Sequence, residues 1–322
     1  MPAKLRGIFY TLGSAACLSV TFVASKQALL ELSPLALAPF WFGIAFSWGI
    51  GYYLLQPHKT PLAQLKQRWK SLFLLGLSSS VANYFLFVNI KLGDPTIIAF
   101  FSRATTIFAL LMGVWLLRER MSQFQWLGAV VAIAGTGVMT YQGGRLIWLV
   151  LALALTSSFF HALTSYIAKR NVTHISPIIL NLARTLGLTI CLGTLSLFMG
   201  ELAWPSPHAL LWIIGGAFFG PFLSYILFYK GIVTLDISQA AILRASQPLF
   251  VALYSYILFG QIISQRQFIG GFVILLGVAL ILWPRRRPHL PQQLRSSTSI
   301  AHGDAQNVIR SQDGAAHSTA NL

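Results

Sequence analysis

Acidic residues are scarce in this sequence. Seven Asp or Glu side chains stand against 23 Lys or Arg in 322 residues, and charged residues of both signs make up 9% of the chain. A soluble globular domain usually carries about 25% charged residues, so this composition excludes one. None of the acidic residues lies in the middle of an apolar run. Because proton-driven cation exporters commonly couple through an intramembrane carboxylate, the absence disfavours cation–proton antiport, and it disfavours intramembrane aspartyl proteolysis as well.

Cysteine is also rare. The two cysteines, Cys17 and Cys191, both lie within apolar runs, so neither a disulfide framework nor a thiolate metal site is predicted. The sequence has no Gly-x-Ser-Gly motif and no phosphate-binding Walker loop, which argues against serine proteolysis and direct use of ATP. We expect no catalytic residue, no metal and no cofactor.

Long apolar runs fill most of the chain. Each is continuously apolar rather than alternating, which predicts membrane-spanning helices rather than barrel strands. The first run is too long for a cleaved signal peptide, and further runs follow it. We therefore predict an all-α polytopic membrane protein with ten helices: 7–29, 33–55, 70–91, 95–117, 123–141, 146–168, 175–199, 208–230, 237–259 and 266–283.

Basic residues near the predicted helix ends are distributed unequally. With the N-terminus inside, fourteen Lys or Arg lie on the inner side and four on the outer side. This bias predicts that both termini are cytoplasmic in a cell (inner or plasma) membrane. It also accounts for the net charge of +16 without a nucleic-acid partner, because the basic residues are dispersed between apolar runs. Residues 285–322 are polar and predict a disordered cytoplasmic tail.

The two halves of the chain resemble each other. "SQFQWLGAVVAIAG" at 122–135 recurs as "SQRQFIGGFVILLG" at 264–277, and Lys26 matches Lys169, 143 positions later. A period near 142 covers five helices, an odd number, so the second copy is inverted in the membrane. We predict one five-helix repeat over 1–141 and a second over 142–284. Inverted repeats of this kind are typical of transporters with binding sites near the bilayer midplane.

These features resemble a known family. Two five-helix repeats, each ending in a helix with a Q-x-x-G…G pattern, are similar to the EamA-type carriers of the drug/metabolite transporter superfamily. In that family the fourth helix of a repeat often carries a proline before a stretch that ends in Glu. Here the first repeat has Glu119 but Ile107 near the proline position, and the second has Pro248 but Gln261 in place of Glu. The resemblance implies a central cavity lined by helices 1, 3, 4, 6, 8 and 9.

Three arginines are embedded in predicted spans. Arg103, Arg184 and Arg244 each lie roughly eight residues, or about 12 Å, from a helix start. This depth is close to the middle of the hydrocarbon core. Arg103 and Arg244 correspond in the two repeats, whereas Arg184 corresponds to Trp41. One interpretation is that the arginines snorkel or bond backbone carbonyls. The other is that they line a wet cavity and bind an anionic group in forked geometry.

Other polar residues in the spans are weaker candidates for substrate binding. Asn83, Tyr84, His161, Tyr225 and Gln247 are polar residues within predicted helices, and interhelical hydrogen bonding is the alternative explanation for each. His161 is the one histidine near a span centre, which makes it the candidate for pH coupling. The aromatic residues, among them the tryptophans, fit interfacial or packing roles.

The combined pattern predicts a secondary transporter of a small metabolite that works by alternating access. Embedded arginines favour an amino acid or organic anion, and the family resemblance favours export. The expected partners are this small-molecule substrate and the lipid bilayer, with a homodimer left open. The alternatives are a channel and a membrane-embedded enzyme acting on a lipid or amphiphile. Such an enzyme needs acid, base or metal groups clustered at one interface, and the scarcity of carboxylates in the sequence argues against it.

Overall fold

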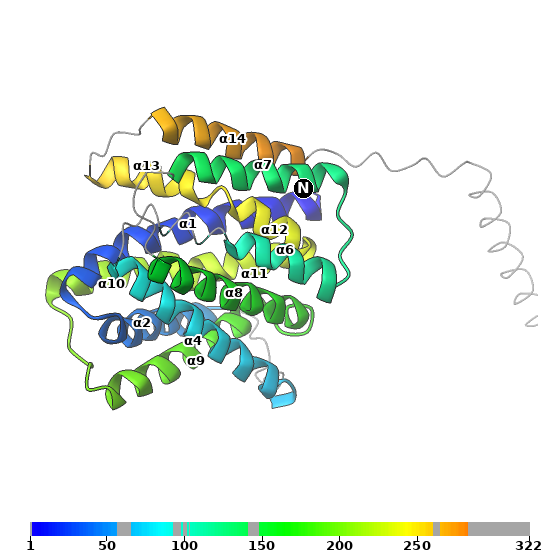
Figure 1. Cartoon of the computed structure of the whole chain (residues 1–322). Helices are drawn as coiled ribbons and strands as arrows, with labels where there is room; N and C mark the ends of the chain where they lie inside the picture. Colours follow the sequence, from blue (N-terminus) through cyan, green and yellow to red (C-terminus); the bar gives the residue numbers. More distant parts are fainter. Residues whose placement is uncertain are drawn as a thin grey trace, which may run out of the picture. The chain divides into compact units, whose positions relative to one another are not determined.

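The computed structural model describes residues 2–56, 66–92, 98, 102, 104–140, 148–259 and 265–282, and every ordered element among them is helical (Figure 1). The predicted tail, 285–322, lies outside the described residues. The helices are α1 (Ala3–Glu31), α2 (Pro34–Leu54), α4 (Trp69–Leu92), α6 (Ala104–Leu116), α7 (Gln123–Thr140), α8 (Trp148–Asn171), α9 (Pro177–Phe198), α10 (Pro207–Ala217), the π-helical η1 (Phe218–Ser224), α11 (Tyr225–Thr234), α12 (Ile237–Arg244), α13 (Gln247–Phe259) and α14 (Gln265–Leu282).

Seven segments of the described chain are long and apolar enough to cross a membrane, judged by length and composition. Each coincides with one of the ten predicted spans. The predicted spans 95–117, 123–141 and 266–283 correspond to α6, α7 and α14, whose described lengths are 13, 18 and 18 residues. The all-helical membrane class is thus observed, whereas the count of ten stays a prediction.

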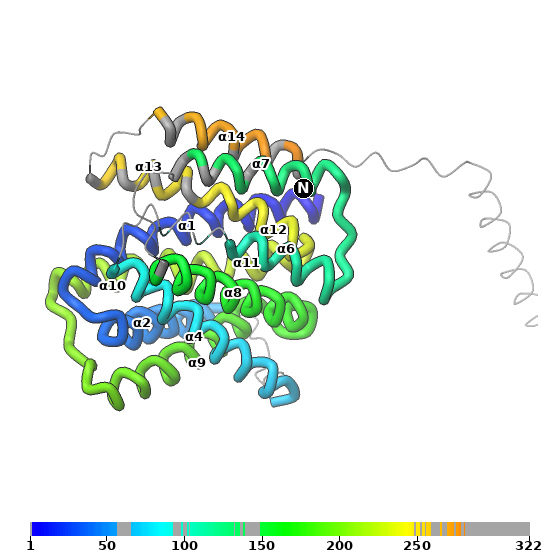
Figure 2. Tube along the Cα trace, in the orientation of Figure 1, coloured from blue at the N-terminus to red at the C-terminus, as the bar shows by residue number. Residues whose placement is uncertain are grey.

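The helices pack in pairs that join distant parts of the sequence. α7 lies along α14, and α2 lies along α9 (Figures 1 and 2). α1 packs against α10, η1 and α11, and α4 packs against α8. α4 also crosses α9 where Gly76 meets Gly187: a Cβ built on Gly76 would lie 3.1 Å from the Gly187 Cα. Only residues without side chains allow these backbones to come so close.

Two of the helix starts follow directly from the sequence. In α2 and α10 a Ser-Pro pair supplies the cap: the backbone N–H of Ala36 donates to the Ser33 hydroxyl, and that of Ala209 donates to the Ser206 hydroxyl, each at 3.1 Å. Proline at the first helical position needs no hydrogen-bond acceptor for a backbone N–H, because it has none.

Two predicted helices depart from regular α-helical geometry: one is broken, and the other is continuous but contains a π-helical turn. The predicted helix 237–259 divides at Ala245–Ser246, where the Ser246 hydroxyl donates to the Leu243 carbonyl at 2.8 Å. Pro248 has no backbone N–H with which to continue the helix across this point. The predicted helix 208–230 contains the π-helical turn η1 around Pro221. Asn181 donates to the buried carbonyl of Pro221 at 3.1 Å.

Candidate functional site

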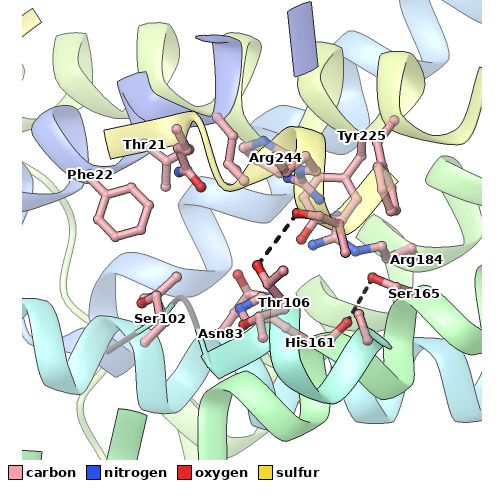
Figure 3. Close-up of a pocket in the computed structure, with 18 of the residues that line it drawn as sticks. Thr21, Phe22, Asn83, Ser102, Thr106, His161, Ser165, Arg184, Tyr225 and Arg244 are labelled. Carbon is pink, nitrogen blue, oxygen red and sulfur yellow. Dashed lines mark hydrogen bonds between the residues drawn. The ribbon is translucent and has the colours of Figure 1, made fainter. Parts of the chain in front are cut away.

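A cavity lies among helices from both halves of the chain. Its wall is formed by α1, α2, α4, α6, α8 and α9, by η1, α11 and α12, and by the first residue of α13. It offers about 90 Å³ of space for the centres of water molecules, several times the ~15 Å³ that one buried water needs. Figure 3 shows Phe22 and Ser102 toward one side of this cavity and Arg184, Tyr225 and Ser165 toward the other.

Arg184 on α9 is the most unusual group at this cavity. Its side chain has no exposed surface. None of its three guanidinium nitrogens has a hydrogen-bond partner among the described residues. Its guanidinium carbon lies 3.4 Å from the centroid of the Tyr225 ring, so a cation–π contact is its main compensation. Such contacts are worth about 2 kcal/mol when desolvated, less than a buried unpaired charge costs.

Arg244 lies on the same side of the cavity. It is the last residue of α12, just before the helix interruption. Its guanidinium carbon is 4.5 Å from the Phe228 ring centroid and 5.7 Å from that of Tyr225. Two guanidiniums therefore share the Tyr225 ring, and the cavity wall between them carries a strong positive potential.

Some neutral polar side chains of the cavity wall donate hydrogen bonds to backbone carbonyls. Asn83 donates to the Ser79 carbonyl at 2.8 Å, and Ser165 donates to the His161 carbonyl at 3.0 Å. Thr106 reaches the Ala241 carbonyl at 3.5 Å, which links α6 to α12 (Figure 3). These bonds hold side chains of both halves at the cavity while leaving lone pairs available to a ligand.

Comparison with known proteins identifies the kind of protein to which this cavity belongs. The family model described as "EamA-like transporter family" matches residues 5–141 and matches again over 148–283. The chain belongs to the EamA-like transporter family. Two matches of nearly equal length agree with the two related halves seen in the sequence.

Individual relatives carry the same general description. An "Uncharacterized transporter" of Methanothermobacter thermautotrophicus is 24% identical over 87% of both chains, and another of Archaeoglobus fulgidus is 25% identical over 83% of this chain and 95% of its own length. A further Archaeoglobus relative is 34% identical, but the match spans only 34% of that protein. A crystal structure that is 18% identical has a TM-score of 0.71 over 86% of this chain and 95% of its own. This EamA-like transporter is therefore a multi-pass membrane protein.

The eight predicted substrate-binding residues of this transporter fall into three groups. Arg103 lies outside the described residues. Tyr84 is absent from the cavity wall and lines a separate pocket with Lys91 and Glu201. Neighbouring residues on a helix point about 100° apart. Because Asn83 takes the position that faces the cavity, Tyr84 points in another direction. The other six line the cavity: Asn83, His161, Arg184, Tyr225, Arg244 and Gln247.

The cavity wall also includes aromatic residues that sequence reasoning did not select. Phe22, Trp41, Phe42 and Phe228 border it. Trp41 was expected in a packing or interfacial role; it is buried in a hydrophobic cluster as packing requires, and it also borders the cavity. One signal was present in the sequence: Trp41 occupies the position in the first half that Arg184 occupies in the second. The cavity wall thus also includes α2 and α9. These correspond to the second and seventh predicted helices, which were not among those that the family resemblance implied.

Proposed function

We propose that this EamA-like transporter is a secondary carrier for a small metabolite with a negatively charged group, an amino acid or organic anion, moved by alternating access. The observation that carries the proposal is the Arg184 guanidinium, which is buried at the cavity without a hydrogen-bond partner in the described structure. A guanidinium stays charged in proteins and forms forked hydrogen bonds with carboxylates and phosphates. An anionic substrate supplies the acceptor that the described residues do not.

Matching contacts in the two halves support inverted repeats. Lys26 on α1 donates to the Ile90 carbonyl near the end of α4, at 3.0 Å. Its sequence counterpart Lys169 on α8 donates to the Ile232 carbonyl near the end of α11, at 2.7 Å. Each lysine thus binds a carbonyl close to the end of a helix of its own half, at an equivalent place in the two halves. Equivalent contacts within each half are what two repeats of the same fold produce, and a repeat of five helices places its second copy inverted in the membrane.

The helix interruptions favour a site at this place. Pro221 of η1 and Gln247 at the start of α13 both border the cavity. Discontinuous helices near the bilayer midplane are a common feature of transporter binding sites. The N-terminus of a half-helix also carries partial positive charge, so the start of α13 adds to the potential set by Arg244.

We propose that both termini face the cytoplasm, as the basic residues predict. A reporter fused after Arg287 is expected to be active in the cytoplasm, and one inserted between Glu201 and His208 is expected outside. Strong signal from a periplasm-specific reporter after Arg287 would overturn the arrangement of ten spans.

Transport itself is tested with the purified protein in liposomes. We expect saturable counterflow of at least one member of a panel of amino acids and organic acids, and the driving gradient then separates export from import. Arg184→Leu is expected to abolish this flux, while Arg170→Leu removes an exposed arginine next to Tyr166 and serves as the matched control. Flux that does not saturate would indicate a channel. Product formation without flux would indicate an enzyme.

A further inference from the structure

The charges around the cavity do not balance. Among the described residues that line it there are two guanidiniums, Arg184 and Arg244, and no carboxylate. The described acidic residues lie at helix ends or in connections, where Glu31, Glu119 and Glu201 accept hydrogen bonds from serine hydroxyls. A ligand with one negative charge reduces this imbalance, whereas a ligand that also brings a positive charge does not.

Part of the cavity wall is apolar. Phe22, Trp41, Phe42 and Leu86 belong to one buried hydrophobic cluster and all border the cavity. Trp41 is fixed in place, since it packs edge-on against Phe87 and lies against Gly216, where any Cβ would overlap its ring. A ligand body that lies against these residues exchanges water for hydrocarbon and aromatic surface, which favours an alkyl or aryl group over a polyol.

Among the described residues of the cavity wall, an ammonium group finds only neutral acceptors. The carbonyl, amide and hydroxyl groups of Asn83, Ser165 and Thr106 offer lone pairs, but none carries a countercharge for a cation. The same cation stands in the field of both guanidiniums. At an effective dielectric constant of about 20, one such like-charge contact is enough to change affinity roughly tenfold or more.

From these three observations we propose that the cavity selects organic anions with an apolar body and no ammonium group, and discriminates against the corresponding amino acids. The proposal rests on the proposed function, because it names the substrate class of the same site. In the bound state the anionic group lies toward Arg244 and Arg184, and the alkyl or aryl body lies toward Phe22, Trp41 and Phe42.

Matched ligands test the charge requirement with the whole protein in liposomes. 3-Phenylpropionate and phenylalanine differ by one ammonium group, as do 4-methylpentanoate and leucine, and phenethylamine keeps the ammonium but lacks the carboxylate. We expect saturable counterflow of both acids. Each amino acid is expected to compete at a concentration roughly tenfold higher or more, and phenethylamine is expected not to compete.

Variants assign the effect to the guanidiniums. Arg184→Gln and Arg244→Gln are expected to reduce the preference for acid over amino acid, and Arg170→Gln is expected to leave it unchanged. Size-exclusion profiles establish that each variant is folded. Should a variant fail to fold, the ligand series on the unaltered protein still decides the question.

The possible failures are distinct. If phenylalanine or leucine exchanges with the same affinity as its matched acid, or if an amino acid exchanges and neither acid does, the proposed transport function is retained and the inference about substrate class is wrong. If neither acid binds or exchanges while other anions do, the apolar part of the inference is wrong. If no compound of the wider panel exchanges, both the proposed transport function and the inference about substrate class are wrong.

Discussion

Glu119 joins the two halves of the transporter, and its removal is expected to destabilise the fold. Its carboxylate accepts hydrogen bonds from the backbone N–H groups of Ile237 and Ser238, at 2.8 and 3.0 Å, and from the Ser238 hydroxyl at 2.5 Å. These groups form the N-terminus of α12. Asp236, which occupies the N-cap position itself, makes no side-chain capping bond, so a residue of the first half caps a helix of the second.

The end of α6 places the Glu119 carboxylate. Arg118 has a φ of 54°, and the backbone N–H of Glu119 donates to the Gly113 carbonyl at 3.0 Å. The chain therefore turns back on the last turn of α6, as helices do when the following residue adopts a left-handed conformation. Gly113 is needed at this point, because a Cβ there would overlap the Ser238 hydroxyl and the Glu119 carboxylate.

The expected loss follows from these contacts. Glu119→Gln keeps an acceptor oxygen and removes the charge, which costs about 1 kcal/mol for a half-buried helix cap. Glu119→Ala removes all three acceptor contacts and leaves two backbone N–H groups without this partner, which costs about 2–3 kcal/mol. The thermal midpoint of the purified protein, followed by tryptophan fluorescence, is expected to fall by roughly 2–4 °C for each kcal/mol.

Glu201→Ala provides the control, since Glu201 is an exposed carboxylate that accepts one hydrogen bond, from Ser33 at 2.5 Å. It is expected to shift the midpoint little, as exposed polar contacts contribute little. A Glu119→Ala midpoint that does not fall below that of Glu201→Ala would refute the argument that Glu119 stabilises α12.

Two further predictions concern packing and the embedded arginines. Gly76→Val is expected to prevent α4 from meeting Gly187 on α9 and to lower the yield of monodisperse protein severely. Gly51→Val, at a position with nothing within 4 Å of an added Cβ, is expected to be neutral in the same chromatographic assay. Arg103→Leu and Arg244→Leu are expected to insert and fold normally, because each removes a charge from an apolar segment, yet to lose flux of an anionic substrate. Full flux by both variants would make these arginines structural.

The sequence was sufficient to predict most helices because apolar length is a strong signal. Runs of about 20 apolar residues led to seven of the segments that the structure shows to be long enough to span a membrane. The interruptions were harder to predict, since a proline in a membrane helix is tolerated whenever neighbouring groups satisfy the freed carbonyls. The Pro221 carbonyl accepts a hydrogen bond from Asn181, which is 40 residues away in sequence, so this contact is visible only in the fold.

The candidate site was predictable where charge gives the signal. Arg184 and Arg244 were selected because an arginine in an apolar segment is costly, and both border the cavity. Aromatic residues give no such signal, because a buried Trp41 or Phe42 is equally consistent with ordinary packing. Tyr84 was selected for its polarity, but polarity does not determine which way a side chain points. Because Tyr84 follows Asn83 on the helix, its side chain points away from the cavity.

The energetics of Arg184 favour a ligand-binding role over a purely structural one. A structural arginine at this depth is expected to bond backbone carbonyls across a helix interface, and Arg184 makes no such bond to any described residue. Its cation–π contact with Tyr225 contributes about 2 kcal/mol of stabilisation, whereas insertion of an arginine at a span centre costs about 2.5–3.5 kcal/mol or more. A leucine in its place is less costly to the empty protein. What a leucine cannot provide is a fixed positive charge beside a cavity that, in the described structure, has no negative group of its own. The arginine is therefore favoured over a leucine only when an anion occupies the cavity.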